Sequence, residues 1–385
     1  MRRRTAALLV LAGFAGGSFT AAFFGRAPRA APPRPHRVQL SPRPQPRPRP
    51  QPQPLPTVTL AAVGDITLGR TPSLPSGGVA AQLHGVRRPL RGDVVLGNLE
   101  TTLADGGSAR CITGSAGCFT FRAPPVYASG LRRAGFTVLN LANNHAYDFG
   151  ASGQAETIAA LDRAGLRHTG RPGEITYLRV GRVRVAVVGF APYRWAQSLL
   201  DIAAAQRLVR TAARHADVVV ATMHAGGEGS AYVHVRPGSE RYLGEPRGDV
   251  IAFAHAVVAA GADVVIGHGP HVLRGLEWYR GRLNAYSLGN FSSYHTLSVS
   301  GVLGVSAILQ VTLRRDGSLV RGHVVPVRLV GAGAPVVDRE QAAWPVLRAL
   351  SRKDFGRRAV GVSRRGDLLV PYGASSNQSR VRKSQ

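Results

Sequence analysis

The chain has 385 residues, of which 44% are hydrophobic and 18% are charged, and its formal net charge is +28. This length and apolar content exclude a wholly disordered protein and provide core for one large domain or two ordinary ones. The excess of positive charge favours a polyanionic neighbour. Nucleic acid is not expected as that neighbour, because the sequence has neither a recognition-helix pattern nor interleaved basic and aromatic residues.

Residues 1–25 predict export. Three arginines precede an apolar, charge-free run from Ala6 to Phe24, and a run of about nineteen apolar residues is long enough to span a bilayer. The residues after the run make a poor cleavage site, so we favour an uncleaved signal anchor over a cleaved signal peptide. The anchored chain would lie at the extracytoplasmic face of the cell membrane, whereas a chain with a cleaved leader would be secreted.

Residues 26–56 predict a disordered spacer. Proline alternates there with Arg or Gln over much of the segment. Because proline lacks an amide donor and fixes φ, such a run forms polyproline II and cannot build a core. We expect it to hold the following domain away from its anchor.

The pattern from residue 57 to residue 349 is that of one folded α/β domain. Apolar runs predict strands at 58–63, 93–96, 138–141, 175–180, 183–190, 216–223 and 263–266. Helical patterns lie near 125–134, 151–164, 199–215 and 248–261, and this alternation of strands and helices predicts an α/β sandwich. Further on, antiparallel strands are expected at 276–279, 283–287, 302–313 and 320–330. Residues 350–385 are basic and are predicted to form a disordered tail.

The two cysteines, Cys111 and Cys118, lie in a loop rich in Gly and Ser. In an exported protein we expect them to pair and to staple that loop. Two isolated free thiols are the alternative.

Donor side chains follow several of the predicted strands. The residues at these positions are Asp65, Glu100, Asn144, His224 and His271. One such residue can be a simple turn or cap residue, but open α/β sheets place their sites at the carboxyl ends of strands. Five donors of oxygen or imidazole type therefore predict converging ligands for a borderline divalent metal such as Mn, Zn or Fe. His145, next to Asn144, would protonate a leaving group or stabilise developing charge.

Seven short blocks occur in order between residues 58 and 300. They are Val63-Gly-Asp65, Gly97-Asn-Leu-Glu100, Phe121-Arg-Ala-Pro124, Asn143-Asn-His-Ala-Tyr-Asp148, His224 with Glu228, Gly267-His-Gly-Pro-His-Val272 and Tyr286-Ser-Leu-Gly-Asn-Phe291. With these blocks the chain resembles the CapA family of capsule and poly-γ-glutamate synthesis proteins, which is related to the calcineurin-like metallophosphoesterases. The resemblance implies a four-layer α/β/β/α sandwich of metallophosphoesterase type. It also implies a membrane-tethered extracytoplasmic protein that helps to make, export or anchor an anionic surface polymer.

The resemblance also implies residue roles. The expected metal positions are Asp65, Glu100, Asn144, His224 and His271, and the expected catalytic positions are His145, Asp148 and Glu228, with Asp148 orienting His145. His268 is a further expected metal position, and a hydrogen bond to the loop backbone is the alternative for it. Three positions depart from the usual pattern: Thr67 stands where a metal-binding histidine is usual, Gly269 replaces the first histidine of His-Pro-His, and Ala225 replaces an aromatic residue. These departures leave one ion, two ions or none as open alternatives.

The expected partners are an anionic surface polymer of poly-γ-glutamate type, the membrane, and the membrane subunits of a polymer synthase. Three functions remain open from the sequence. The first is biosynthesis, export or anchoring of the polymer. The second is a metal-dependent phosphoesterase or cell-wall hydrolase, and the third is a non-catalytic module that binds polyanions.

Overall fold

The structure is a computed structural model that describes residues 25, 30, 31, 55–111 and 118–371. The predicted signal anchor, nearly all of the predicted spacer and the last 14 residues of the predicted tail lie outside these residues. The chain divides into two units, Met1–Pro52 and Gln53–Gln385, and the fold described here belongs to the second. Within the described ranges, no helix combines the length and the apolar character needed to cross a membrane.

One sheet has eight strands in the order β18-β17-β16-β1-β2-β5-β6, with β15 also paired to β1. β2, β5, β6 and β15 continue the sheet in parallel from β1, whereas β16 to β18 are antiparallel. The strands are β1 (Thr57–Thr67), β2 (Val94–Leu99), β5 (Val138–Asn140), β6 (Arg167–Thr169), β15 (Asn290–Ser293), β16 (Val305–Arg314), β17 (Leu319–Val330) and β18 (Ala334–Val337).

The second sheet has six strands in the order β13-β14-β12-β9-β8-β7. β8, β9, β12 and β14 are parallel, and β7 and β13 close the two edges in antiparallel pairing. The strands are β7 (Thr176–Val180), β8 (Val183–Phe190), β9 (Val218–His224), β12 (Val264–His268), β13 (Leu276–Tyr279) and β14 (Arg282–Ala285). Three short pairs lie outside these sheets in the described ranges. They are β3 (Thr102–Leu103) with β4 (Arg122–Ala123), β10 (Glu240–Tyr242) with β11 (Glu245–Gly248), and a third pair near the C-terminus that is described below.

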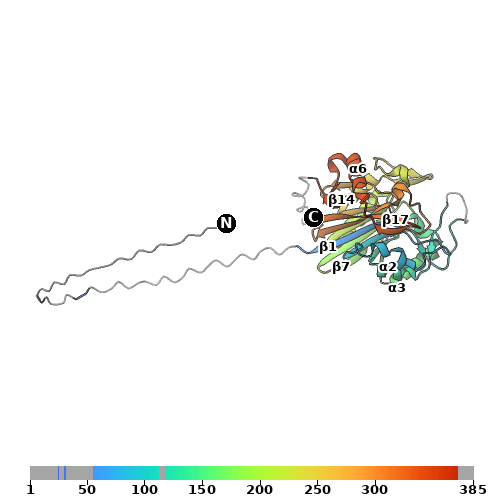
Figure 1. The fold of residues 1–385 in the computed structure, drawn as a ribbon, viewed down its shortest axis with the longest axis horizontal. Helices are drawn as coiled ribbons and strands as arrows, with labels where there is room; N and C mark the ends of the chain where they lie inside the picture. The colour runs from blue at the N-terminus through green and yellow to red at the C-terminus, as the bar shows by residue number, and fades with distance from the viewer. Residues whose placement is uncertain (1–24, 26–29, 32–54, 112–117, 372–385) are drawn as a thin grey trace, which may run out of the picture. The chain divides into compact units, whose positions relative to one another are not determined.

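Alternating side chains along the strands build the layers. In β8, Val185 and Val187 pack into the core between the two sheets, whereas Ala186 and Val188 pack under helices on the outer face. Helices α4 (Ile202–His215) and α5 (Val250–Ala260) cover that outer face. Helices α1 (Gly78–Gln82), α2 (Tyr127–Ala134) and α3 (Gly150–Arg163) cover the eight-stranded sheet, and Figure 1 shows α2 and α3 together on one side of the strands. The packing therefore gives the predicted four-layer α/β/β/α order.

All strands and helices that the sequence predicts are present, and their ends differ by a few residues. The predicted disordered tail is wrong for residues 350–371. Helix α6 (Ala343–Phe355) runs through its start, and a short pair, β19 (Gly361–Val362) with β20 (Leu368–Leu369), follows. The apolar side of α6, including Trp344 and Leu347, closes the core between the sheets. The basic composition of this segment suggested disorder, but the basic residues of α6, such as Arg352, lie on its exposed side.

The predicted pairing of Cys111 with Cys118 is confirmed, since the two form a disulfide. Cys118 and the neighbouring Arg110 both line the pocket described below. The disulfide therefore joins two points of the chain at the rim of that pocket.

Candidate metal centre and the pocket beside it

The site begins where β1 passes very close to the turn before β15. The amide of Asp65 donates to the carbonyl of Gly289 at 2.9 Å, and a Cβ at Gly64 would come within 1.8 Å of that oxygen. Only glycine at position 64 allows this approach. Asp65 lies within β1 rather than just after it, because pairing with β15 extends the strand to Thr67.

Three predicted ligands converge at the carboxyl ends of strands from both sheets. Asp65 lies in β1, Glu100 directly follows β2, and His224 is the last residue of β9. Each offers a donor atom within 4.8 Å of those of the other two, and all three side chains are completely buried. Because the two sheets pack with these strand ends at the same rim, residues far apart in sequence share one small space.

Glu100 is the member of this triad that most needs a cation. Neither of its carboxylate oxygens has a hydrogen-bond partner among the described residues. Burial, with the nearby charge of Asp65, raises the pKa of Glu100 well above its usual value. Its nearest cationic neighbour, His271 Nδ1, lies 3.8 Å away and is hydrogen-bonded to Asp65 instead. A buried carboxylate without hydrogen bonds is costly, and a divalent cation would satisfy it. The triad of two carboxylates and one imidazole therefore fits a Mn, Zn or Fe ion.

Asn98 organises the space around the triad and was not singled out by the sequence. Its amide nitrogen donates to Asp65 Oδ1 at 2.8 Å and lies 3.1 Å from His224 Nδ1. Its oxygen accepts from Asn140 at 2.8 Å and from Asn143 at 3.1 Å. One fully buried side chain thus fixes two expected metal donors and ties them to the loop after β5. Its place in the block that ends at Glu100 is the only sequence signal for it.

His271 bonds directly to Asp65. Its Nδ1 lies 3.1 Å from Asp65 Oδ2 and 3.0 Å from Asn290 Oδ1, and its φ of 60° places it in the left-handed region. Burial opposes the charged imidazole, but the charges of Glu100 and Asp65 and the hydrogen bond to Asp65 raise the pKa of His271 to about 10. Burial likewise opposes the Asp65 carboxylate, yet the contact with His271 holds the pKa of Asp65 below its usual value. The two form a buried ion pair.

His268, the last residue of β12, lies beside His224 in the sheet. Its Nε2 is 3.0 Å from the hydroxyl of Thr222. Its Nδ1 lies 4.0 Å from Asp65 Oδ1 and has no hydrogen bond within the described ranges. Burial lowers the pKa of His268 to about 4, so the ring is neutral at pH 7. A neutral buried imidazole with a free nitrogen is suited to metal binding.

His145 and Asp148 form a pair at the edge of the centre. His145 Nδ1 lies 2.8 Å from Asp148 Oδ2, which also accepts the amide of Phe121 at 2.7 Å. Asp148 Oδ1 forms an ion pair with Arg110 at 3.1 Å, and the ring of Phe121 packs against His145 at 4.3 Å between centroids. The carboxylate is thus in a position to orient the imidazole.

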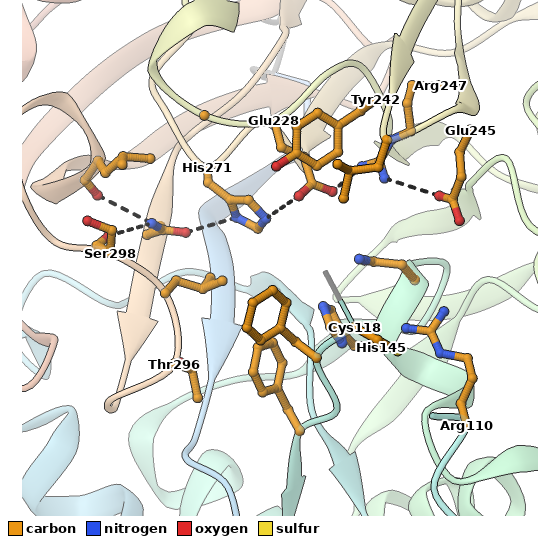
Figure 2. A pocket seen from close by; sticks show the side chains of 18 residues that line it. Arg110, Cys118, His145, Glu228, Tyr242, Glu245, Arg247, His271, Thr296 and Ser298 are labelled. Atoms are coloured by element: carbon orange, nitrogen blue, oxygen red, sulfur yellow. Dashed lines mark hydrogen bonds and ion pairs between the residues drawn. The ribbon is translucent and has the colours of Figure 1, made fainter. Parts of the chain in front are cut away.

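A pocket of about 460 Å³ opens beside these residues. It is lined by Asn144, His145, Glu228 and His271 of the predicted site. Figure 2 shows Glu228 next to His271 and Arg247, with His145 and Arg110 on the opposite side. The side-chain oxygen of Asn144 is buried and has no hydrogen-bond partner in the part of the chain that is described. The pocket therefore presents polar groups from two directions to one space.

Arg247, in β11, is a buried residue of the site that sequence reasoning missed. It pairs with Glu228 at 2.8 Å and donates to the hydroxyl of Tyr193 at 2.6 Å, while one of its nitrogens lies 3.4 Å from His224 Nε2. Glu228 Oε2 is in turn 3.7 Å from His271 Nε2. Glu228 therefore lies between two cationic groups. An isolated arginine before a helix gives no signal of such a role.

The structure thus gathers the predicted residues at one rim of the sandwich. Asp65, Glu100 and His224 form the triad, with His268 and His271 within 4.0 Å of Asp65. Asn144, His145, Glu228 and His271 line the adjoining pocket, and Asp148 supports His145 from behind.

Comparison with known proteins adds a family. A model of the family described as “Bacterial capsule synthesis protein PGA_cap” matches residues 59–295. The chain is 32% identical over 259 residues to the capsule biosynthesis protein CapA of Bacillus anthracis, covering 62% of this chain and 56% of that protein. It is 30% identical over 240 residues to the PGA biosynthesis protein CapA of Bacillus subtilis, covering 58% and 59%. The chain thus spans somewhat more than half the length of these two relatives.

A probable polyglutamine synthesis accessory protein of Mycobacterium tuberculosis is 29% identical over 328 residues, covering 75% of this chain and 79% of that protein. Among solved structures, the chain is similar to a putative 5'-nucleotidase from Staphylococcus aureus, with 15% identity and a TM-score of 0.43 over 77% of this chain and 58% of that one. A 5'-nucleotidase precursor from Thermus thermophilus gives 15% identity and a TM-score of 0.39 over 77% and 59%. Both TM-scores are below 0.5, so no inference about function rests on them.

Proposed function

The chain belongs to the bacterial capsule synthesis family, and from this membership we propose that it takes part in the biosynthesis, export or anchoring of an anionic surface polymer of poly-γ-glutamate type. The two Bacillus relatives are described as capsule and PGA biosynthesis proteins and the mycobacterial one as a polyglutamine synthesis accessory protein. The proposed partners are the polymer and the membrane subunits of its synthase.

We propose that the contribution of this chain is metal-dependent hydrolysis of a bond in the polymer or in its attachment. One observation carries this proposal: the completely buried Glu100 carboxylate, without a hydrogen-bond partner in the described ranges, lies against Asp65 and His224. A cation at this triad would supply Lewis acidity to the bond being cleaved. Asp65, Glu100 and His224 would hold it, and His268 and His271 stand within 4.0 Å of Asp65.

The remaining residues of the site handle protons and position the substrate. Asp148 holds Nδ1 of His145, so Nε2 is the atom left to give a proton to the departing group. Glu228, held by Arg247 at 2.8 Å, faces the same pocket as His145. This arrangement suits general acid catalysis by His145 on a substrate bound between His145 and Glu228.

Two measurements test the proposal on the full chain. Metal analysis should find Mn, Zn or Fe in stoichiometric amount, and less than that would favour a binding module without chemistry. With metal bound, His145→Ala should lower turnover of poly-γ-glutamate or of a phosphodiester by roughly 10²-fold or more, with metal content unchanged. His84→Ala, at an exposed histidine, is the matched control. Turnover retained in His145→Ala would contradict the role of His145.

We further propose that residues 1–25 anchor the chain so that its domain lies outside the cytoplasm. The support is the charge-free apolar run after three arginines. Fractionation of cells that express the full chain should place it in the membrane pellet, accessible to protease added to spheroplasts. A chain that remains in the cytosolic fraction would contradict this proposal.

A further inference from the structure

A second concave surface lies on the outer face of the six-stranded sheet. This groove, of about 980 Å³, is formed by the edge strand β7, the start of β8 and helix α4. α4 packs on β8 and β9, and β7 contributes Tyr177, Leu178 and Arg179 to the lining of the groove. Its lining residues include three arginines, Arg167, Arg179 and Arg184, together with His215 and Tyr177.

Strand alternation places the charges on one face. Leu178 and Val180 pack against the core between the sheets, so Tyr177 and Arg179 point outward, and both are exposed. Arg179 lies directly opposite Arg184 of β8 in the antiparallel register. Like charges directly opposite each other destabilise a sheet unless anionic groups compensate them.

The fold compensates only one of these two arginines. Asp217 accepts from Arg184 and from Arg315, so Arg184 is neutralised. Arg179 donates to the carbonyl of Gly181 at 3.3 Å and has no carboxylate partner in the described portion of the chain.

Arg167 adds a second uncompensated charge. It is exposed at the start of β6, on the other sheet, and it forms no ion pair with any residue that the structure describes. His215, at the end of α4, contacts Tyr177 edge to face at 6.5 Å between centroids. The groove thus offers two guanidinium groups without an ion pair to any described residue, contributed by different sheets, and the imidazole of His215 on α4.

We propose that this groove is a binding site for an extended polycarboxylate chain, with Arg167 and Arg179 as its carboxylate-binding residues. The planar guanidinium group matches a carboxylate with two parallel hydrogen bonds. The two uncompensated guanidinium groups come from different strands, so a chain with repeated carboxylates can bind both of them. The identity of the occupant rests on the proposed function, in which this chain handles an anionic surface polymer.

The groove lies at the opposite end of the sheet from the metal centre. Arg184 is near the start of β8, whereas His224 ends the parallel neighbour β9. The eight residues of β8 correspond to about 26 Å of extended strand. A long polymer bound in the groove would therefore be held by the domain without occupying the pocket, which raises its local concentration there.

Binding of labelled poly-γ-glutamate to the full chain in detergent, at physiological ionic strength, tests the proposal. The double variant Arg167→Glu/Arg179→Glu should weaken binding about tenfold or more, and it should flatten the dependence on salt. The matched control, Arg339→Glu/Arg352→Glu, changes the net charge equally at exposed positions elsewhere and should change affinity by less than about threefold. Equal losses in both variants, or no loss in the first, would overturn the proposal.

Two further arms separate the occupants and the two proposals. If the groove variant loses binding to phosphatidylglycerol vesicles or to a single-stranded DNA oligonucleotide but keeps poly-γ-glutamate binding, the assignment to a polycarboxylate is wrong. Metal content and turnover of a small phosphodiester should be unchanged in the groove variant. Conversely, Glu100→Gln should leave the binding of poly-γ-glutamate in the groove unchanged. Failure of the metal proposal and failure of the groove proposal therefore give different results.

Discussion

Glu100 shows how a single residue can be unfavourable for the metal-free fold and still define the site. Its carboxylate is completely buried and, among described residues, it has no hydrogen-bond donor. Asp65, by contrast, is held by Asn98, by the amide of Gly269 at 3.2 Å and by His271. Of the two carboxylates, Glu100 is therefore the one that a bound cation would stabilise more.

The replacement Glu100→Gln tests this dependence. Without metal, the variant should be at least as stable as the wild type, because it no longer buries a carboxylate that lacks hydrogen bonds. With a saturating metal at about 100 times its Kd, the wild type should gain about 2.7 kcal/mol of unfolding free energy, and the variant should gain little of it. Thermal unfolding with and without Mn²⁺ or Zn²⁺ measures both, with Glu340→Gln at an exposed carboxylate as control. If metal raises the unfolding free energy of Glu100→Gln as much as that of Glu340→Gln, the triad is not the metal site.

At the scale of elements, three stacked aromatic rings support the loop that carries His145. Trp195 lies between Tyr147 and Tyr193, with centroids 5.1 Å away on each side. Its indole nitrogen donates to the carbonyl of Asn143 at 3.0 Å, and Tyr193 accepts from Arg247. The stack thus connects the loop after β5 to the arginine that holds Glu228.

Trp195→Ala should therefore affect both stability and activity. We expect the unfolding free energy to fall by about 2 kcal/mol. This is less than for a fully buried tryptophan, because the ring of Trp195 is half-buried. Turnover should fall although metal content persists, since the triad does not include this loop. Trp195→Phe keeps an aromatic ring in the stack but loses the hydrogen bond. Its stability and turnover should therefore lie between those of the wild type and those of Trp195→Ala. Denaturant unfolding and turnover are the readouts, and an unchanged turnover in Trp195→Ala would contradict a positioning role.

At the scale of the whole molecule, Glu277 joins the C-terminal segment to the six-stranded sheet. Its buried carboxylate accepts from His255 of α5 at 2.9 Å and from the hydroxyl of Tyr286 at 2.7 Å, and it pairs with Arg358 at 3.1 Å. Burial opposes its charge, but the hydrogen bonds from His255 and Tyr286 hold the pKa of Glu277 below its usual value. His255, in the middle of α5, is therefore a structural residue.

This network predicts a pH dependence of stability. A lowered pKa in the folded state means that the Glu277 carboxylate stabilises the fold above the unfolded value of about 4.3, and that this contribution disappears as the pH falls through the folded value. Glu277→Gln should thus be less stable than the wild type at pH 7, and the difference should shrink in acid. Urea unfolding of both proteins, from pH 7 down to acid pH, measures this difference in stability. A difference that stays constant down to acid pH would show that the charge of Glu277 is not involved.

The sequence by itself determined the local structure and the candidate chemistry of this protein. Apolar periodicity located the main strands and helices, and donors after strand ends, with the family blocks, identified Asp65, Glu100, His224 and His271. These features are local, because a strand, a turn and a donor are each encoded by neighbouring residues. The charge of residues 350–385 misled, since charge does not show whether a helix such as α6 has an apolar side to bury.

Only the tertiary structure decided which of these donors meet and what holds them. Asn98, Arg247 and Trp195 act through partners distant in the chain, and of the three only Asn98 lies in one of the family blocks. The same applies to the basic groove, where Arg167 and Arg179 come from strands of different sheets. Charge, burial and hydrogen bonding depend on distances in space, and those distances are set when the two sheets pack against each other.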